Sequence, residues 1–118
     1  MQDFKKLRVW HKALALALNT DRLVARITAR RYAPLKNQLF RAASSIPANI
    51  AEGRRKKTDA DFAKFLGIAA GSSSELESHL IFAHKSGIIG ERQFVELVGQ
   101  TIEVRKMLFA LIRRLTKD

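Results

Sequence analysis

Hydrophobic residues recur every three or four positions along most of the chain, and they do not alternate with polar residues as in a half-buried strand. Residues at this spacing lie on one face of a helix, so the pattern is typical of amphipathic helices. It covers residues from about 9–29, 34–52, 58–86 and 91–115, with glycine or proline between the segments. The sequence therefore predicts an all-α fold of four helices.

Pro47 lies inside the second segment, whose apolar stripe continues across it over residues 39–50. A helix that began at Pro47 would be barely two turns long, which is too short to be stable alone. We therefore predict one helix with a kink at Pro47, where the proline leaves the carbonyl of Ala43 without its usual donor. Either water or a side-chain donor is expected to replace it, and Ser44 and the Asn49 amide are the candidate side chains.

Other helix ends are marked by capping residues. Thr58, with Asp61 three residues later, is a carboxylate version of the capping box and begins the third helix. Gly87 is expected to end that helix, and Gly53 suits the left-handed conformation just beyond the second one. The fourth helix begins after Gly90, which is a weaker cap than serine.

Small residues are concentrated in the middle of two helices, as "AASS" at 42–45 and "AAGSSS" at 69–74. Small side chains let two helix axes approach each other closely. Gly71 costs about 1 kcal/mol relative to alanine inside a helix, and a close contact is expected to offset this cost. We predict that the second and third helices touch there.

The last helix has two adjacent apolar seams. The first seam is expected to pack on the core. The second adds more apolar surface than a small four-helix core usually buries. The second seam belongs either to a broad buried face or to a contact with a neighbouring subunit, and the sequence does not choose between them. The first seam consists of Phe94, Leu97, Thr101, Val104, Leu108, Leu111 and Leu115, and the second of Val95, Val98, Ile102, Arg105, Phe109 and Ile112.

Composition limits the remaining possibilities. A chain of 118 residues with 47% hydrophobic residues predicts a single domain over residues 1–118. The absence of cysteine excludes disulfides and thiolate chemistry and fits a cytoplasmic location. No apolar run approaches the roughly 20 residues of a membrane span, so no membrane partner is expected. The 22 Lys and Arg against 11 Asp and Glu give a net charge of +11, which favours a polyanionic partner.

Three stretches carry a resemblance to a known family: "FKKLRVWHKA" at 4–13, "QLFRAASSIPANIAEG" at 38–53 and "FAKFLGIAAGSSSELESHL" at 62–80. Together they resemble the small bacterial four-helix-bundle proteins encoded by intervening sequences within 23S ribosomal RNA genes. The most specific part is the run from Ser45 to Gly53, and the likeness covers nearly the whole chain. The dense basic run over residues 54–57 departs from the family pattern.

The resemblance implies an antiparallel up-down four-helix bundle that assembles into a ring-like homo-oligomer, commonly a pentamer. It implies no enzymatic activity and no cofactor. A related accessory protein of diversity-generating retroelements looks like the same bundle and binds a reverse transcriptase and nucleic acid. By analogy alone, this favours a role in RNA binding or beside a retroelement.

An up-down bundle brings the N-terminus, the turn after the second helix and the C-terminus to one end. We predict that this end binds nucleic acid, RNA rather than DNA, mainly through phosphates and with strong salt dependence. The plain alternative is a solvated basic face. A second stripe, Arg22, Arg26 and Arg30 with Arg31 and Lys36 beside it, is more typical of the wet face of a helix. The candidate nucleic-acid-binding residues are Lys5, Lys6, Arg8, Lys12, Arg54, Arg55, Lys56, Lys57, Arg113, Arg114 and Lys117.

Asn49, Glu52, Ser72 and Glu75 are polar residues near the predicted helix contact. We expect them to form a structural hydrogen-bond network, since no nucleophile accompanies them in a catalytic arrangement. The histidines do not follow glutamate at the spacing of carboxylate-bridged metal bundles, so no metal site is predicted. The competing function is a protein-interaction scaffold, for example for a reverse transcriptase, without direct nucleic-acid binding.

Overall fold

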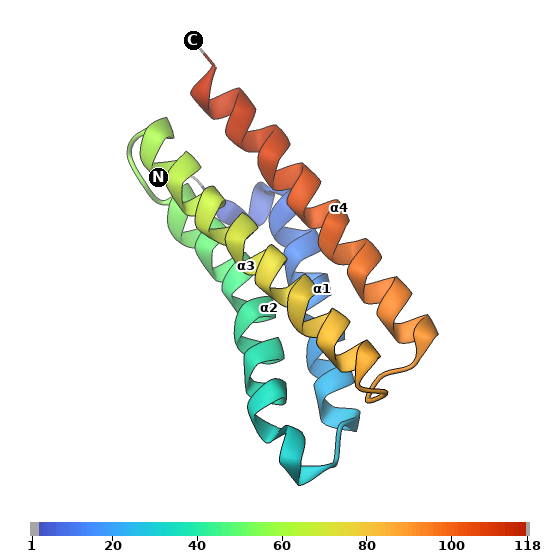
Figure 1. The fold of residues 1–118 in the computed structure, drawn as a ribbon. Helices are drawn as coiled ribbons and strands as arrows, with labels where there is room; N and C mark the ends of the chain where they lie inside the picture. The colour runs from blue at the N-terminus through green and yellow to red at the C-terminus, as the bar shows by residue number, and fades with distance from the viewer. Residues whose placement is uncertain (1–2, 118) are drawn as a thin grey trace.

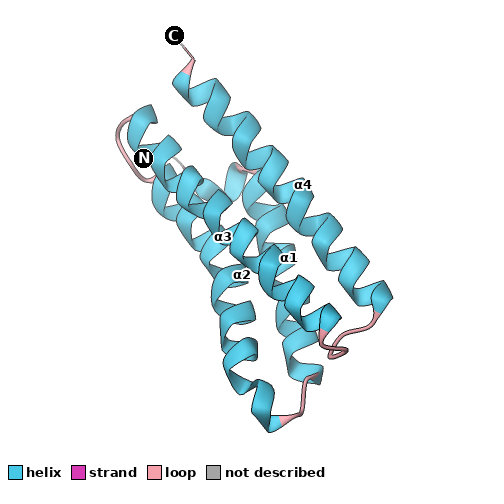
Figure 2. Cartoon of the chain, viewed as in Figure 1, coloured by secondary structure: helices cyan, strands magenta, loops and turns pink. Residues whose placement is uncertain are grey.

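The computed structural model describes residues 3–117, and this part of the chain consists of four long α-helices and two short 3-10 turns, without a strand. The all-α prediction is therefore confirmed. The helices are α1 (Arg8–Arg26), α2 (Ala33–Arg54), α3 (Asp59–Lys85) and α4 (Glu91–Thr116), and the 3-10 turns are η1 (Phe4–Lys6) and η2 (Arg30–Tyr32). Figure 2 shows how little of the chain lies in the loops between them.

The helices pack antiparallel into a rod of 48 × 20 × 19 Å (Figure 1). Each helix packs on its neighbours in the chain, and α4 also packs on α1, which closes the bundle. We call the end that holds residues 3–8, 52–61 and 113–117 the terminal end. The other end, with residues 26–34 and 85–92, is the distal end.

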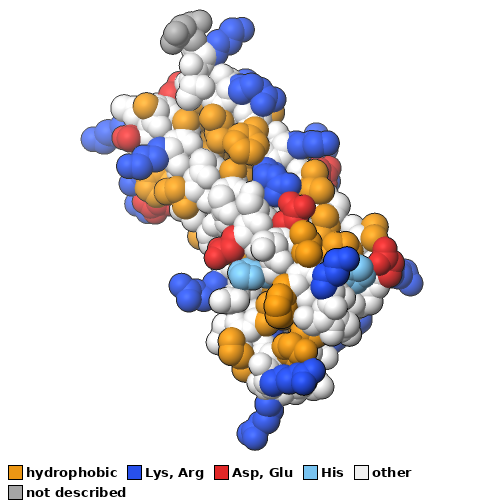
Figure 3. All heavy atoms as spheres, viewed as in Figure 1, with side chains coloured by type: hydrophobic (Ala, Val, Ile, Leu, Met, Phe, Trp, Pro, Cys, Tyr) orange, Lys and Arg blue, Asp and Glu red, His pale blue; other side chains and the backbone are white. Residues whose placement is uncertain are grey.

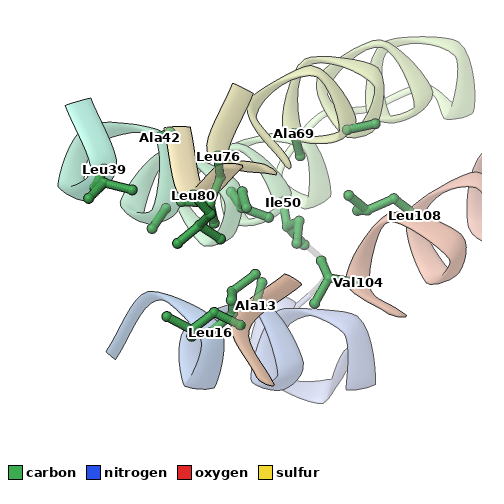
Figure 4. Packing of buried hydrophobic residues seen from close by; sticks show 14 of the residues in the cluster. Ala13, Leu16, Leu39, Ala42, Ile50, Ala69, Leu76, Leu80, Val104 and Leu108 are labelled. Carbon is green, nitrogen blue, oxygen red and sulfur yellow. The ribbon is translucent and has the colours of Figure 1, made fainter. Parts of the chain in front are cut away.

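All four helices contribute to the core, which follows the axis of the rod (Figure 4). Leu16, Leu39, Leu76 and Leu108, one from each helix, are completely buried. On α4 the first predicted seam contains every residue of that helix that is buried. The second seam is not fully buried, because Val95 is 57% exposed and Phe109 is 46% exposed.

The first helix ends at Arg26, three residues before the predicted end at Ala29. Ile27 is extended, with φ −84° and ψ 110°, and its N–H donates to the carbonyl of Val24 at 3.0 Å. Its side chain is nevertheless buried in the core. The apolar periodicity therefore continues past the last helical turn, which explains why the predicted end of the helix is too late.

Pro47 lies inside α2, and the helix is continuous across it, as predicted. The predicted replacement donors are bonded elsewhere. The Asn49 amide donates to the carbonyl of Ser45 at 2.8 Å, and the Ser44 hydroxyl donates to that of Arg41 at 3.4 Å. Both side chains reach back along the helix one turn, so they meet these carbonyls rather than that of Ala43.

Gly53 does not follow the helix but lies inside it, buried against α3. The prediction of a left-handed residue here is wrong, because only Gly87, among the described residues, has a positive φ. A Cβ on Gly53 would lie 2.7 Å from the Cβ of Phe65 and 3.2 Å from the carbonyl oxygen of Phe62. The glycine is therefore required by the close approach of α2 and α3.

Gly71 was expected to allow that close approach, and this expectation is wrong. A Cβ at Gly71 would have no atom within 4 Å, and the residue is exposed. The alanines of the two small-residue stretches do pack between α2 and α3: Ala42, Ala43, Ala69 and Ala70 are buried. One face of each stretch is thus used inside the bundle, while Gly71 lies on the other face.

Apart from Gly53, the predicted helix caps agree with the structure. The Thr58 hydroxyl accepts a hydrogen bond from the N–H of Asp61 at 3.1 Å, and α3 begins directly after Thr58. Gly87 has φ +80° directly after the C-cap of α3. Gly90 precedes α4, and the Gln93 side chain accepts from its N–H at 3.2 Å. These caps are confirmed because they depend on local sequence.

Candidate nucleic-acid interface

The terminal end brings together three basic segments that are far apart in the sequence: the N-terminal turn, the α2–α3 turn and the end of α4 (Figure 1). Figure 3 shows Lys and Arg side chains projecting from this end, at the top of the view. The structure thus places the predicted cations in one region of the rod. Those that are exposed are Lys5, Lys6, Arg8, Arg55, Lys56, Lys57, Arg113, Arg114 and Lys117.

Some of these cations already contact carboxylates. Glu52 lies 3.8 Å from Arg55 and 3.1 Å from Lys56, one turn earlier on α2. Lys12 lies 3.6 Å from Glu103 of α4. All these side chains are at least 35% exposed, and exposed ion pairs are worth about 0–1 kcal/mol. A phosphate can therefore compete for these cations at little cost.

The contact of Lys12 also shows how the set is spread. Glu103 lies in the middle of α4, so the second turn of α1 is level with the centre of that helix rather than with its end. Arg113, Arg114 and Lys117 lie farther along the rod. The basic region is consequently an end and part of the adjoining sides, not a flat cap.

Two aromatic rings lie beneath the basic run of the α2–α3 turn. The guanidinium of Arg54 is 5.5 Å from the centre of the Phe62 ring, and the ammonium of Lys56 is 5.0 Å from that of Phe65. Such contacts hold a cation over an aromatic face. These ring contacts are not among the predictions from the sequence. The available signal was the short turn before Phe62, which brings the end of α2 close to the start of α3.

Three aspartates also lie at the terminal end. The side chain of Asp3 accepts from the N–H of Lys5 at 2.9 Å. Asp59 and Asp61 lie in the first turn of α3, where a negative charge interacts favourably with the helix dipole. They lower the positive potential beside Lys57 but leave the end with an excess of cations.

The distal end is basic as well. Arg22 and Arg26 lie on α1, but Arg30 lies in η2, after that helix has ended, so the predicted stripe along one helix is broken. All three residues are exposed. Arg92 of α4 and Lys85 of α3 add to them from the other connection. The basic excess is thus not confined to the predicted end, because the turns between helices at both ends carry cations.

The predicted polar network is half formed. The hydroxyls of Ser45 and Ser72 are 2.5 Å apart and join α2 to α3, and the Asn49 amide donates to the Ser45 hydroxyl at 3.2 Å. Glu52 instead pairs with the basic turn, and Glu75 lies 3.9 Å from His79. Both carboxylates lie toward solvent, where water and cations solvate them better than a packed contact does. Ser45 is the central member, and its position in the "AASS" stretch was the available signal.

No metal centre is suggested by the arrangement of acidic and imidazole groups: residues 3–117 contain no group of at least three His, Cys, Asp or Glu side chains close enough to hold an ion. His84 is 2.8 Å from Glu91 and stacks on Phe94 at 4.1 Å between ring centres. Within the same residues, every helix is too short or too polar to cross a membrane.

Comparison with known proteins gives a consistent result. A crystal structure of a protein of unknown function from the S23 ribosomal protein family of Bacteroides thetaiotaomicron is similar, with a TM-score of 0.84 and 26% sequence identity. The match covers 89% of this chain and 98% of that chain. No curated protein matches. Neither this structure nor the family below is described as an enzyme.

The family model described as 23S rRNA-intervening sequence protein matches residues 5–110. This segment contains nearly all of the four helices and the motifs of α2 and α3 that carried the resemblance. The chain therefore belongs to the 23S rRNA-intervening sequence protein family.

Proposed function

We propose that this protein is a non-enzymatic, oligomeric bundle that binds nucleic acid, RNA rather than DNA, through its terminal end. The observation that carries the proposal is the meeting of three separate basic segments at one end of the rod. Each segment alone resembles a solvated helix end. Together they give this end an excess of positive charge, which attracts a phosphate backbone.

Contacts at this end suit phosphate better than bases. Most of its cations are exposed. Of the two rings beneath them, Phe62 is only 4% exposed, and Phe65 is half-buried with the Lys56 ammonium 5.0 Å from its ring centre. Phosphate contacts position a nucleic acid without reading its sequence. We therefore expect binding with little sequence preference and a steep dependence on salt.

The test compares two double variants that each lose two positive charges. Arg55→Ala with Lys57→Ala alters the terminal end, whereas Arg41→Ala with Lys106→Ala alters exposed positions in the middle of the rod. Binding to a labelled RNA is measured over a range of salt concentrations. The terminal variant should lower the slope of log K against log salt by about 0.7 for each lost contact with a single strand.

The middle variant should keep the slope of the unaltered protein. Equal slopes for the two variants would show that binding responds to net charge alone and would contradict an interface at the terminal end. Thermal unfolding of both variants checks that neither substitution disturbs the bundle.

Self-association is the second part of the proposal. Besides Phe82, four large apolar side chains of α3 and α4 are between 41% and 57% exposed. Figure 3 shows apolar side chains on the visible face of the molecule. Apolar surface of this kind often marks a protein contact. A ring of subunits would repeat the terminal end around an axis. The side chains are Ile68, Ile81, Val95 and Phe109.

The same apolar face supports the competing function, a scaffold for another protein such as a reverse transcriptase in a retroelement. A purified protein that retains no RNA at low salt but captures such a partner would favour the scaffold. The cytoplasmic location expected for a cysteine-free chain remains a prediction.

A further inference from the structure

Three neighbouring hollows lie at the distal end, and they differ in chemistry. The first, of about 390 Å³, lies between α1 and α4 and is lined by Arg22, Arg26 and Arg92. Its floor contains Leu23 and Leu97, which are buried. Arginines of two helices therefore line one recess together with buried leucines.

The guanidiniums of this first hollow lack a matching anion. Glu96 is the carboxylate in its lining, and none of the three arginines forms an ion pair within residues 3–117. Arg22 is held in place, since it donates to Asn19 at 2.7 Å and Asn19 donates to Gln100 at 3.1 Å. Planar guanidinium groups are suited to phosphate because they bind it through two parallel hydrogen bonds.

A second hollow, of about 470 Å³, lies between the start of α2 and the end of α3. Tyr32, Leu35 and Phe82 line it together with the polar side chains of Gln38 and Ser78. A mostly apolar recess with a few polar groups is typical of a site for a flat organic ring. Phe82 is 56% exposed, which leaves one side of the recess open.

The ring of Tyr32 is fixed by its neighbour. The guanidinium of Arg31 lies 4.8 Å from the ring centre, and it donates to the Tyr32 hydroxyl at 3.0 Å. An aromatic face held beside a cation is the arrangement on which unpaired bases stack. The imidazole of His79 closes the inner wall, where Glu75 is 3.9 Å from it.

The third hollow neighbours the other two. It has a volume of about 280 Å³ and shares Arg26 with the first hollow and Arg31 and Tyr32 with the second. A ligand can therefore follow the surface from the arginines to the aromatic recess without leaving the protein. Because the rod is about 20 Å wide, the path has room for only a few nucleotides.

We propose that the distal end binds a short single-stranded stretch of nucleic acid, with a phosphate at Arg22, Arg26 and Arg92 and an unpaired base against Tyr32. A single strand fits this path because its bases are free to stack on a side chain, whereas those of a duplex are paired and stacked on each other. The proposal rests on the nucleic-acid function proposed above but uses the opposite end of the rod.

The experiment measures binding of a short single-stranded RNA that contains the fluorescent base 2-aminopurine, with the matching duplex as the second probe. Stacking of the base on Tyr32 should quench its fluorescence. Tyr32→Ala should weaken single-strand binding about ten-fold and remove the quenching, whereas Tyr32→Phe, which keeps the ring, should preserve both. Duplex binding should change little in either variant.

Arg26→Ala supplies a test that does not depend on the half-buried Tyr32. It should lower the salt slope for the single strand by about 0.7, the value for one lost phosphate contact. Unchanged single-strand binding and quenching in both Arg26→Ala and Tyr32→Ala would overturn the proposal. An equal loss of duplex and single-strand binding in Tyr32→Ala would also overturn it.

The double variant Arg55→Ala with Lys57→Ala separates this proposal from the one above. If it alone weakens binding, the terminal end is the interface and the distal site is wrong. If only the distal variants weaken binding, the distal site stands and the terminal interface is wrong. A protein that binds neither probe at low salt overturns both.

Discussion

The two sides of α3 use small residues in different ways. Toward α2, alanines of the helix are buried, and Gly53 on the facing helix leaves no room for a side chain beside Phe65. Toward solvent, Gly67, Gly71 and Ser74 follow each other at helical spacing and are all exposed, and a Cβ on either glycine would meet nothing within 4 Å.

The difference shows which glycine the single chain explains. A helical glycine costs about 1 kcal/mol relative to alanine. The close contact with Phe65 offsets this cost at Gly53, but no contact within the chain does so at Gly71. Ile68 and Ile81, which are 45% and 41% exposed, flank the outer glycines. A helix of a second subunit that packs on this side would explain both features.

The largest expected effect comes from placing a charge on the outer side of α3. If the proposed oligomer packs on this side, Gly71→Glu should dissociate it to a single chain of 13.3 kDa, because an unpaired carboxylate opposes burial in an interface. The helix itself should not suffer, since glutamate is a better helix former than glycine. Light scattering measures the mass, and circular dichroism measures the helix content.

Ala25→Glu is the matched control, because Ala25 is exposed on α1, which does not pack on α3. It should leave the mass unchanged. An unaltered protein with the mass of one chain, or a Gly71→Glu variant that stays assembled, would refute the assignment of this side to an interface.

A smaller effect is expected on the inner side. Gly53→Ala should lower the free energy of unfolding by about 1–3 kcal/mol, because the new Cβ would overlap the Phe65 Cβ and neither belongs to a flexible chain end. Urea denaturation at a fixed protein concentration measures the change. Gly99→Ala in α4, where a Cβ meets nothing within 4 Å, is the control and should raise the same free energy by about 1 kcal/mol. A Gly53→Ala variant as stable as the control would show that α2 and α3 separate easily.

This contrast also indicates how far the sequence predicts the structure. The caps at Thr58 and Gly87 were correct because a few adjacent residues determine them. The close helix contact was predicted at Gly71 but lies at Gly53, since a glycine looks the same in the sequence whether a neighbouring helix or solvent faces it. The end of α1 was missed because Ile27 reaches the core from an extended backbone.

The candidate sites show the same limit. The up-down order of helices was enough to bring the basic segments to the terminal end. The rings of Phe62 and Phe65 below the basic turn, and the meeting of Arg92 with the α1 arginines, depend on how neighbouring helices are rotated. Periodicity gives the buried face of a helix but not which polar residues of two helices line one recess.

The smallest expected effect concerns the hydroxyl contact between α2 and α3. Ser45→Ala removes the partner of Ser72 and the side-chain acceptor of Asn49, and it should cost about 1 kcal/mol of unfolding free energy. Ser72→Ala should cost a similar amount. Since both substitutions break the same bond, the double variant should be less destabilised than the sum of the two, and urea denaturation of all four proteins measures this coupling. Additive losses would mean that the two hydroxyls bind water separately, and the small residues of this contact would then act only by letting α2 and α3 approach each other.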